Sequence, residues 1–293
     1  MAKPRFSVSQ ITTFHQTFDE DLASYAAAGV EGVGIWQFKL PEDGNDREAL
    51  AKLKDSGLKA TTMIPGTLSI HPVPFPGPDD PAERTEELCA TIRRFAPFEP
   101  EVVLVLPGAP AAGSDPDEAR RVTVEGFRKA AKVAAEYGLT LGMEPLHREI
   151  YGTWTTVYTI PQTIDLIDEI GEPNVQVLYD VYHLHDTDNV LEDTVKYGSR
   201  ISPSIHICDW REVTRNDFDR VLPGDGIIDL EGIFGALDAA ADPRWVDLEI
   251  FSDDGSFSEM DFEDSLWKQP AADVLARAKA GFDKAWAARR PPV

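Results

Sequence analysis

The chain has 293 residues and a mass of 32.3 kDa, a length that suits either two average domains or one α/β barrel. It carries 51 Asp and Glu against 28 Lys and Arg, which gives a net charge of −23. So negative a field repels the phosphates of nucleic acids and anionic membrane surfaces, and we expect no partner of either kind. The hydrophobic content of 42% is typical of a globular chain with a sizeable core.

The cysteine content and the first residues bear on the compartment. Cys89 and Cys208 are the two cysteines, too few for a disulfide framework, which fits a reducing environment. The first fourteen residues lack the apolar run of a signal peptide, and no stretch approaches the about 18 apolar residues of a membrane span. We therefore expect a cytoplasmic protein.

Short apolar runs alternate with helical patterns from one end of the chain to the other. Most of the runs lack polar alternation, as expected for parallel strands that are buried on both faces. Eight strands are predicted, at Phe6–Thr13, Gly32–Phe38, Lys59–Pro65, Val102–Pro107, Leu139–Pro145, Val175–Tyr182, Ile201–Cys208 and Val246–Phe251. Eight helices are predicted, at Asp19–Ala28, Asp46–Ser56, Pro81–Phe95, Pro116–Tyr137, Pro161–Ile170, Val190–Tyr197, Leu230–Ala240 and Pro270–Ala288.

The rhythm of these units predicts the fold class. Gly29, Gly57 and Gly138 each stand between a helix and a strand, where a left-handed cap is expected. No Gly/Ser-rich linker divides the chain, so eight βα units predict an α/β fold with a single (β/α)8 TIM barrel over residues 1–293. The competing fold is a doubly wound open sheet, but no G-x-G-x-x-G follows the first strand.

Four polar residues end the last four predicted strands, where a barrel has its active site. Glu144, Asp180, His206 and Glu249 come from one strand each, so we expect them to converge on the barrel axis. Three carboxylates and one imidazole make an oxygen-rich site suited to Mn²⁺, Mg²⁺ or Co²⁺, of which we expect Mn²⁺. The alternative is a set of solvated rim residues, but carboxylates among apolar residues such as Leu248 are costly to bury without a cation.

Further candidates lie near the same strand ends. His183 and His147 follow Asp180 and Glu144 by three residues each. We expect no functional role for the other histidines outside the four-residue set, which are His15, His71 and His185. Arg220 precedes a Pro-Gly-Asp-Gly turn that can direct a guanidinium inward onto a substrate oxygen, although an exposed arginine is the alternative. The indole rings that could form an apolar wall for a sugar, or pack in the ordinary way, are Trp36, Trp154 and Trp210.

These residues together resemble a known family. Glu-Pro-Leu at 144–146, Asp-Val-Tyr-His at 180–183, His-Ile-x-Asp at 206–209, the Pro-Gly-Asp-Gly turn and Glu249 resemble the xylose isomerase-like TIM barrel family across essentially the whole chain. That family holds sugar epimerases and isomerases, inosose dehydratases and the endonuclease IV branch. The resemblance implies one divalent metal at the positions Glu144, Asp180, His206 and Glu249 and substrate oxygens held by His183 and Arg220.

The resemblance also implies a reaction. A carbon-bound proton next to a carbonyl is too weakly acidic for an unaided carboxylate, and a metal can stabilise the enediolate as a Lewis acid. Glu144 and Glu249 would then take and return the proton on opposite faces of the substrate. We therefore expect a divalent-metal-dependent sugar isomerase or epimerase that acts on a small carbohydrate, in a family where homo-oligomers are common.

A lyase is the alternative function. Many family members carry Asn where His147 stands, and Glu-Pro-Leu-His with Asp-Trp-Arg at 209–211 resembles the large subunits of bacterial C-glycoside deglycosidases. There His147 would be the base for elimination from a 3-keto glycoside, and a small β-type subunit would be the partner. A keto-inositol dehydratase would use similar chemistry. DNA repair of the endonuclease IV type is disfavoured, because Asp219 is followed by Arg220 and Val221 rather than by an Asp-x-His pair.

Overall fold

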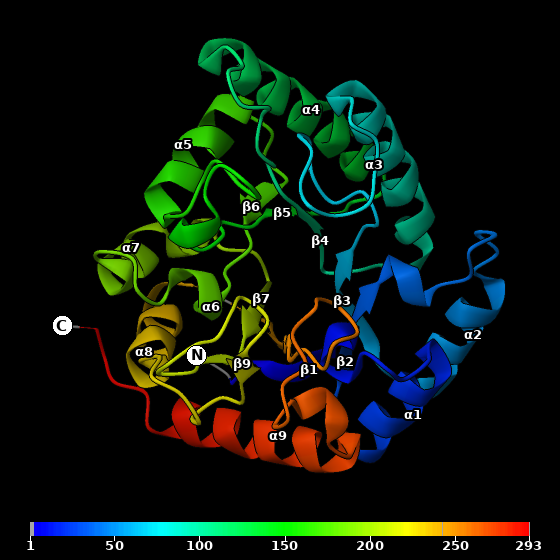
Figure 1. Cartoon of the computed structure of the whole chain (residues 1–293), viewed down its shortest axis with the longest axis vertical. Helices are drawn as coiled ribbons and strands as arrows, with labels where there is room; N and C mark the ends of the chain where they lie inside the picture. Colours follow the sequence, from blue (N-terminus) through cyan, green and yellow to red (C-terminus); the bar gives the residue numbers. More distant parts are fainter. Residues whose placement is uncertain (1–2, 242, 293) are drawn as a thin grey trace.

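Eight parallel strands form the inner sheet of the computed structural model, which describes residues 3–241 and 243–292. The strands are β1 (Arg5–Ser9), β2 (Gly32–Trp36), β3 (Lys59–Ile64), β4 (Val102–Val105), β5 (Leu141–Met143), β6 (Val175–Val177), β7 (Ser204–Ile207) and β10 (Trp245–Leu248). Their order is β6-β5-β4-β3-β2-β1-β10-β7, and parallel bridges at Val177–Ile201 and Asp180–His206 join the two outer strands. The chain is thus the predicted (β/α)8 barrel, with helices around the strands (Figure 1).

The helices lie close to their predicted bounds. They are α1 (Phe18–Ala27), α2 (Arg47–Ser56), α3 (Pro81–Phe95), α4 (Pro116–Glu136), α5 (Ile160–Ile170), α6 (Val181–Leu184), α7 (Val190–Tyr197), α8 (Leu230–Ala240) and α9 (Ala271–Ala287). Asp80 and Asp115 cap the N-termini of α3 and α4, where their carboxylates accept hydrogen bonds from backbone N–H groups. Both helices have Pro at the first helical position. Gly29, Gly57 and Gly138 have φ of +68°, +74° and +69°, which confirms the predicted caps. None of the described helices is long and apolar enough to cross a bilayer.

The barrel interior is more polar than the apolar strand runs indicate. Asp247 on β10 is fully buried and accepts hydrogen bonds from the Thr61 hydroxyl at 2.7 Å, the Thr62 amide at 3.2 Å and the Ser204 hydroxyl at 3.1 Å. Because these donors come from β3 and β7, the carboxylate ties strands across the barrel. A buried carboxylate with this many donors is satisfied without a cation.

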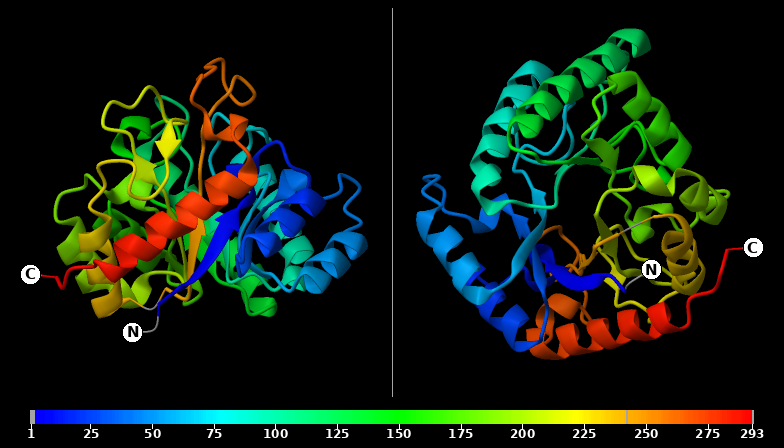
Figure 2. Two further views of the ribbon diagram at one scale, coloured as in Figure 1. Left: turned by 90° about the horizontal axis from the view of Figure 1, so that it is seen from below. Right: turned by 180° about the vertical axis from the view of Figure 1, so that it is seen from behind.

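The βα loops differ most from the predicted elements. Residues after β1 turn into a 3-10 helix at Gln10–Thr13, and the short helix α6 starts directly after Asp180. An unpredicted antiparallel ribbon, β8 (Asp209–Trp210) with β9 (Arg220–Val221), follows β7. The ribbon and the loop after β10 rise at the end of the barrel that lies opposite the N-terminus (Figure 2, left). Several strands end earlier than predicted, so the polar residues predicted at their carboxyl ends lie on loops at this end of the barrel.

Candidate metal centre

Four buried side chains meet at the carboxyl ends of β5, β6, β7 and β10. Glu144 follows β5, Asp180 precedes α6, His206 lies within β7 and Glu249 follows β10. Each offers one ligand atom, and these atoms all lie within 4.8 Å of one another. The structure therefore brings together the four residues that the sequence singles out as metal ligands.

The cluster holds more negative than positive charge. His206 Nδ1 lies 3.1 Å from Glu144 Oε1 and 3.3 Å from Glu249 Oε2. Burial lowers the pKa of His206, but the charges and hydrogen bonds of Glu249 and Glu144 outweigh burial and hold that pKa well above its usual range. Burial raises the pKa of Glu144 to about 7 against the opposing effect of His206. Glu144 and Glu249 thus share the imidazole of His206.

Arg220 supplies the second positive charge. Its Nη1 lies 3.1 Å from Asp180 Oδ2 and 3.2 Å from Glu249 Oε2. Burial raises the pKa of Asp180, but the charges of Arg220 and His183 lower it by more. The pKa of Asp180 therefore lies below its ordinary value. The guanidinium itself is packed against the rings of Tyr182 at 4.1 Å and Phe251 at 4.9 Å from their centroids.

The donor set fits a divalent cation. Three carboxylates and one imidazole within bonding reach of a common point match an oxygen-rich site with one nitrogen ligand. His206 directs Nδ1 at the carboxylates, and its Nε2 has no hydrogen-bond partner among the described residues. A cation at this point would replace the proton on His206 and compensate Glu144, the carboxylate of the cluster that Arg220 does not reach.

Two N–H groups position the ring of His183. The backbone N–H of His147 donates to His183 Nδ1 at 3.1 Å, and Arg220 Nη2 lies 3.4 Å from Nε2. Burial lowers the pKa of His183 to about 3, which keeps the ring neutral. Nε2 lies 3.6 Å from Asp180 Oδ2, and His183 lines the cavity above the cluster. Nε2 can therefore form a hydrogen bond with a substrate oxygen.

The side chain of His147 is not part of the cavity wall. Its ring packs against Trp210, with centroids 4.8 Å apart, and lies 6.1 Å from the ring of His185. Its Nε2 lies 3.4 Å from Asp186 Oδ1. The interaction that links His147 to the site is the backbone hydrogen bond to His183. The geometry gives no support to the predicted role of His147 as a base, and Trp210 likewise lies outside the lining.

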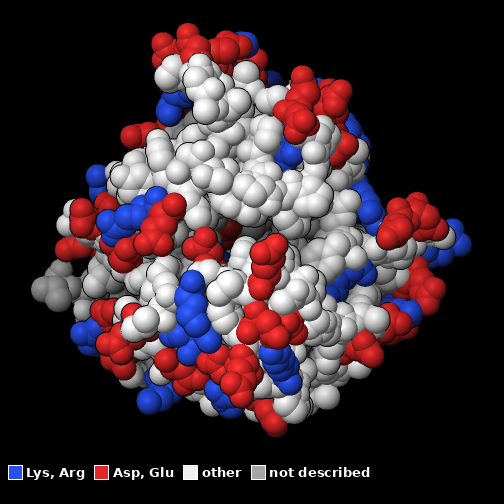
Figure 3. All heavy atoms as spheres, viewed as in Figure 1, with Lys and Arg blue, Asp and Glu red and all other residues white. Residues whose placement is uncertain are grey.

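A cavity of about 710 Å³, its open mouth included, leads down to the cluster. Trp36, Glu144, His183, Arg220 and Glu249 line it, as their predicted roles require. Figure 3 shows the hollow near the middle of this face, bordered on its upper side by uncharged atoms. The cavity thus joins the buried carboxylates to the surface.

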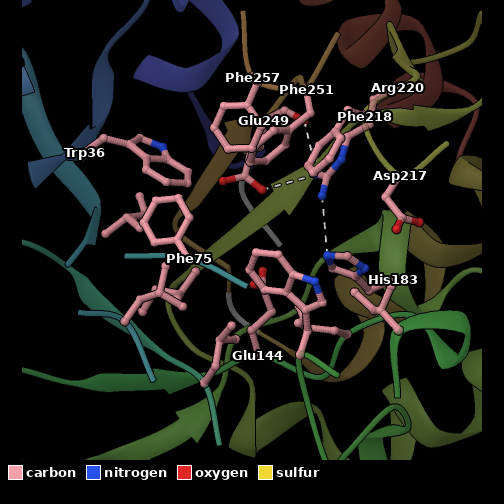
Figure 4. A pocket seen from close by; sticks show the side chains of 17 residues that line it. Trp36, Phe75, Glu144, His183, Asp217, Phe218, Arg220, Glu249, Phe251 and Phe257 are labelled. Atoms are coloured by element: carbon pink, nitrogen blue, oxygen red, sulfur yellow. Dashed lines mark hydrogen bonds and ion pairs between the residues drawn. The ribbon is translucent and has the colours of Figure 1, made fainter. Parts of the chain in front are cut away.

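Several lining residues escaped the sequence reasoning. They are Asp217, Phe75, Phe218, Phe251 and Phe257, and all lie on βα loops. Asp217 lines the cavity beside His183 (Figure 4), and burial raises the pKa of its carboxyl group. One sequence signal could have indicated the phenylalanines. Large aromatic residues are unfavourable in solvent-exposed loops, so their presence in loops rich in Pro, Gly, Asp and Ser indicates a buried or binding role.

The turn that places Arg220 is built around a buried carboxylate. The Asp209 carboxylate accepts hydrogen bonds from the backbone N–H groups of Trp210 at 2.8 Å, Gly224 at 2.9 Å and Ile228 at 2.9 Å. A Cβ on Gly226 would lie 2.3 Å from the Trp210 carbonyl oxygen, so only glycine fits at this point of the predicted Pro-Gly-Asp-Gly turn. This turn directly follows strand β9, which presents Arg220 to the carboxylates.

Residues 22–278 match the family described as xylose isomerase-like TIM barrel. The chain belongs to this family. A Streptomyces coelicolor protein named "Putative hydroxypyruvate isomerase" is 27% identical over 85% of this chain and 91% of its own length. An inosose dehydratase of Erwinia tasmaniensis is 29% identical over 47% of this chain and 49% of its own length, and a D-psicose 3-epimerase of Enterocloster bolteae is 31% identical over 41% and 36%.

Solved structures share the fold over nearly the whole chain. A Sinorhizobium meliloti protein superimposes with a TM-score of 0.80 at 27% identity, over 96% of this chain and 98% of that one. The IOLI protein, solved with a bound zinc atom, superimposes with a TM-score of 0.77 at 20% identity, over 97% and 98%. The relatives are named as isomerases, epimerases and a dehydratase, so this family member is an enzyme of the same superfamily.

Proposed function

We propose that this protein is a divalent-metal-dependent sugar isomerase or epimerase that moves a proton on the carbon next to a carbonyl group. The observation that carries the proposal is the buried cluster at the base of a cavity that Glu144 and Glu249 both line. A bound divalent ion, for which the oxygen-rich donors favour Mn²⁺, would act as a Lewis acid toward negative charge that develops on the carbonyl oxygen.

The chain's own residues supply the proton transfers. Glu144 follows β5 and Glu249 follows β10, two strands that are not neighbours in the barrel, so the two carboxylates can address a substrate from two faces. One carboxylate takes the proton from carbon while the other returns it. His183 and the guanidinium of Arg220 line the cavity and would orient the substrate oxygens.

Elimination is the second candidate, because a named inosose dehydratase matches nearly half of the chain. It begins with the same proton abstraction and differs in the departure of a leaving group from the neighbouring carbon. Since the ring of His147 lies outside the cavity lining, this candidate also uses Glu144 or Glu249 as the base. Both reactions therefore depend on one set of residues.

The test is a screen in D₂O with added Mn²⁺, in which free ketoses, keto-inositols and 3-keto glycosides are followed by NMR. We expect solvent deuterium at the carbon next to the carbonyl, with isomerised product for the first function and eliminated product for the second. Chelation or Glu249→Gln should abolish the exchange, whereas Glu259→Gln, an exposed residue of the neighbouring loop, should leave it unchanged. Exchange that survives Glu249→Gln would refute the proposal.

A further inference from the structure

Asp247 is a buried carboxylate inside the barrel that belongs neither to the four-residue cluster nor to the cavity lining. It lies in β10 two residues before Glu249, and side chains two apart along a strand point to the same face. Residues two apart are separated by about 7 Å along a strand. The Asp247 carboxylate therefore lies in the layer of side chains directly below the candidate metal ligands.

The same layer contains a residue of the strand that carries the histidine of the cluster. Ser204 stands two residues before His206 in β7, as Asp247 stands before Glu249, and its hydroxyl donates to Asp247 Oδ2 at 3.1 Å. The strands β7 and β10 are neighbours in the sheet. Asp247 and Ser204 are thus paired one layer below Glu249 and His206.

The hydrogen-bond partners of Asp247 hold its charge without neutralising it. The Thr61 hydroxyl donates at 2.7 Å, the Thr62 amide at 3.2 Å and the Ser204 hydroxyl at 3.1 Å, and all three donors are neutral. These bonds satisfy the carboxylate oxygens, but a negative charge in a protein interior is costly unless a positive charge compensates it. The charge of Asp247 therefore remains able to attract a cation.

The barrel is built closely around this carboxylate. A Cβ on Gly34 would lie 3.4 Å from Asp247 Oδ2 and 3.0 Å from the Ser9 Cα, so a larger side chain at this position would reach the carboxylate. Trp245, two residues before Asp247, is also fully buried and lies toward the amino ends of the strands. Because solvent has no contact with Asp247, water and salt screen its charge little.

We propose that Asp247 raises the affinity of the cluster for its divalent ion from the layer below, through its negative charge and without contacting the ion. In the metal-free protein the charge repels the carboxylates above it, and a bound cation replaces this repulsion by attraction. Groups outside the ligand set commonly tune metal affinity in this way. The inference rests on the proposed function for the presence of the metal, and it adds a residue beyond the four ligands.

Asp247→Asn separates the charge from the structural role. The amide oxygen can accept the hydrogen bonds of Thr62 and Ser204, and the amide N–H can donate to Thr61, whose hydroxyl can donate instead to Ser7 Oγ at 2.8 Å. We expect about 10- to 100-fold weaker Mn²⁺ binding, followed by the EPR signal of the free ion. The free energy of unfolding of the metal-free variant, measured by urea titration with a chelator, should equal or exceed that of the wild type, because the cluster loses a repelling charge.

Asp46→Asn is the matched control, because it removes one charge from a buried carboxylate outside the barrel. Asp46 precedes α2 and pairs with Arg94 at 2.7 Å. This variant should lose stability and keep its Mn²⁺ affinity. Asp247→Ser removes the charge with a smaller side chain and should repeat the weaker Mn²⁺ binding. Circular dichroism confirms that each variant is folded.

Unchanged Mn²⁺ affinity with reduced stability in Asp247→Asn would mean that Asp247 only ties the strands together, and would overturn the inference. An equal loss of affinity in Asp46→Asn would overturn it as well. A wild-type protein that binds no Mn²⁺ would refute both the inference and the proposed function. Weaker Mn²⁺ binding by Asp247→Asn without deuterium exchange on any carbonyl substrate would refute the proposed reaction alone. Mn²⁺-dependent exchange with equal affinities in the wild type and Asp247→Asn would refute the inference alone.

Discussion

At the scale of single residues, the site is governed by the compensation of buried charge. Glu144, Asp180 and Glu249 are almost fully buried, and Arg220 and His206 are the basic groups in direct contact with them. Removing one member of such a network leaves an unpaired buried charge, which is more costly than the loss of one contact. The consequences can be measured in the metal-free protein.

Arg220→Met should destabilise the metal-free protein by about 3–5 kcal/mol, because Asp180 and Glu249 would lose their nearest cation. The free energy of unfolding is measured by urea titration in the presence of a chelator. Arg211→Met is the matched control, since Arg211 is partly exposed and pairs with Asp219 at 2.9 Å, which Arg215 also holds. Equal losses in the two variants would contradict the argument.

Metal affinity should rise with pH. Burial holds the pKa of Glu144 at about 7, and the carboxylates hold that of His206 above its usual range, so the metal-free cluster retains protons at neutral pH. Ligands must lose these protons to bind a cation, so binding releases protons and weakens as the pH falls below 7. Mn²⁺ titrations between about pH 6 and 8 should show up to about tenfold tighter binding per pH unit for each proton released. Affinity that is independent of pH would contradict the pKa shifts.

At the scale of elements, the sequence predicts the strands and helices better than the loops that make the site. Apolar runs and helix caps are local signals, so helices such as Pro81–Phe95 have their predicted bounds. The four predicted ligands also meet as expected, because strand ends of a barrel share one face. The ring of His147 and the phenylalanines that line the cavity could not be placed, because side-chain direction in a βα loop depends on contacts with distant loops.

The turn after β9, which accepts its bracing from Asp209 of β8, offers a test at this scale. Asp209→Ala should lower the free energy of unfolding by about 2–3 kcal/mol, because three backbone N–H groups would lose their acceptor. The turn directly follows β9, which carries Arg220, so activity should fall with stability. Asp225→Ala in the same turn removes only an exposed pair with Arg277 and should change stability little. The free energy of unfolding of both variants is measured by urea titration. Equal values would contradict the claim that Asp209 stabilises the turn.

At the scale of the whole molecule, the dominant property is a net charge of −23. Three of the 51 acids form the cluster, and Figure 3 shows many others on the outer surface of this face. Self-repulsion among exposed charges opposes the compact state, and salt screens that repulsion. The excess charge therefore predicts a stability that depends on ionic strength.

Raising NaCl from about 10 to about 200 mM should increase the melting temperature by about 2–4 °C, which corresponds to about 1 kcal/mol for a chain of this size. Calorimetry of the metal-free protein gives the shift without interference from changes in metal binding. A melting temperature that falls as salt is added would mean that the surface ion pairs outweigh the net repulsion.

The central claim is that Glu144, Asp180, His206 and Glu249 hold one divalent ion at the base of an aromatic cavity. The most direct measurement is the anomalous diffraction of crystals grown with Mn²⁺. We predict a single strong peak between the four side chains, about 2.0–2.3 Å from three carboxylate oxygens and His206 Nδ1. Crystals that bind Mn²⁺ elsewhere, or that show no peak at this cluster, would contradict the account.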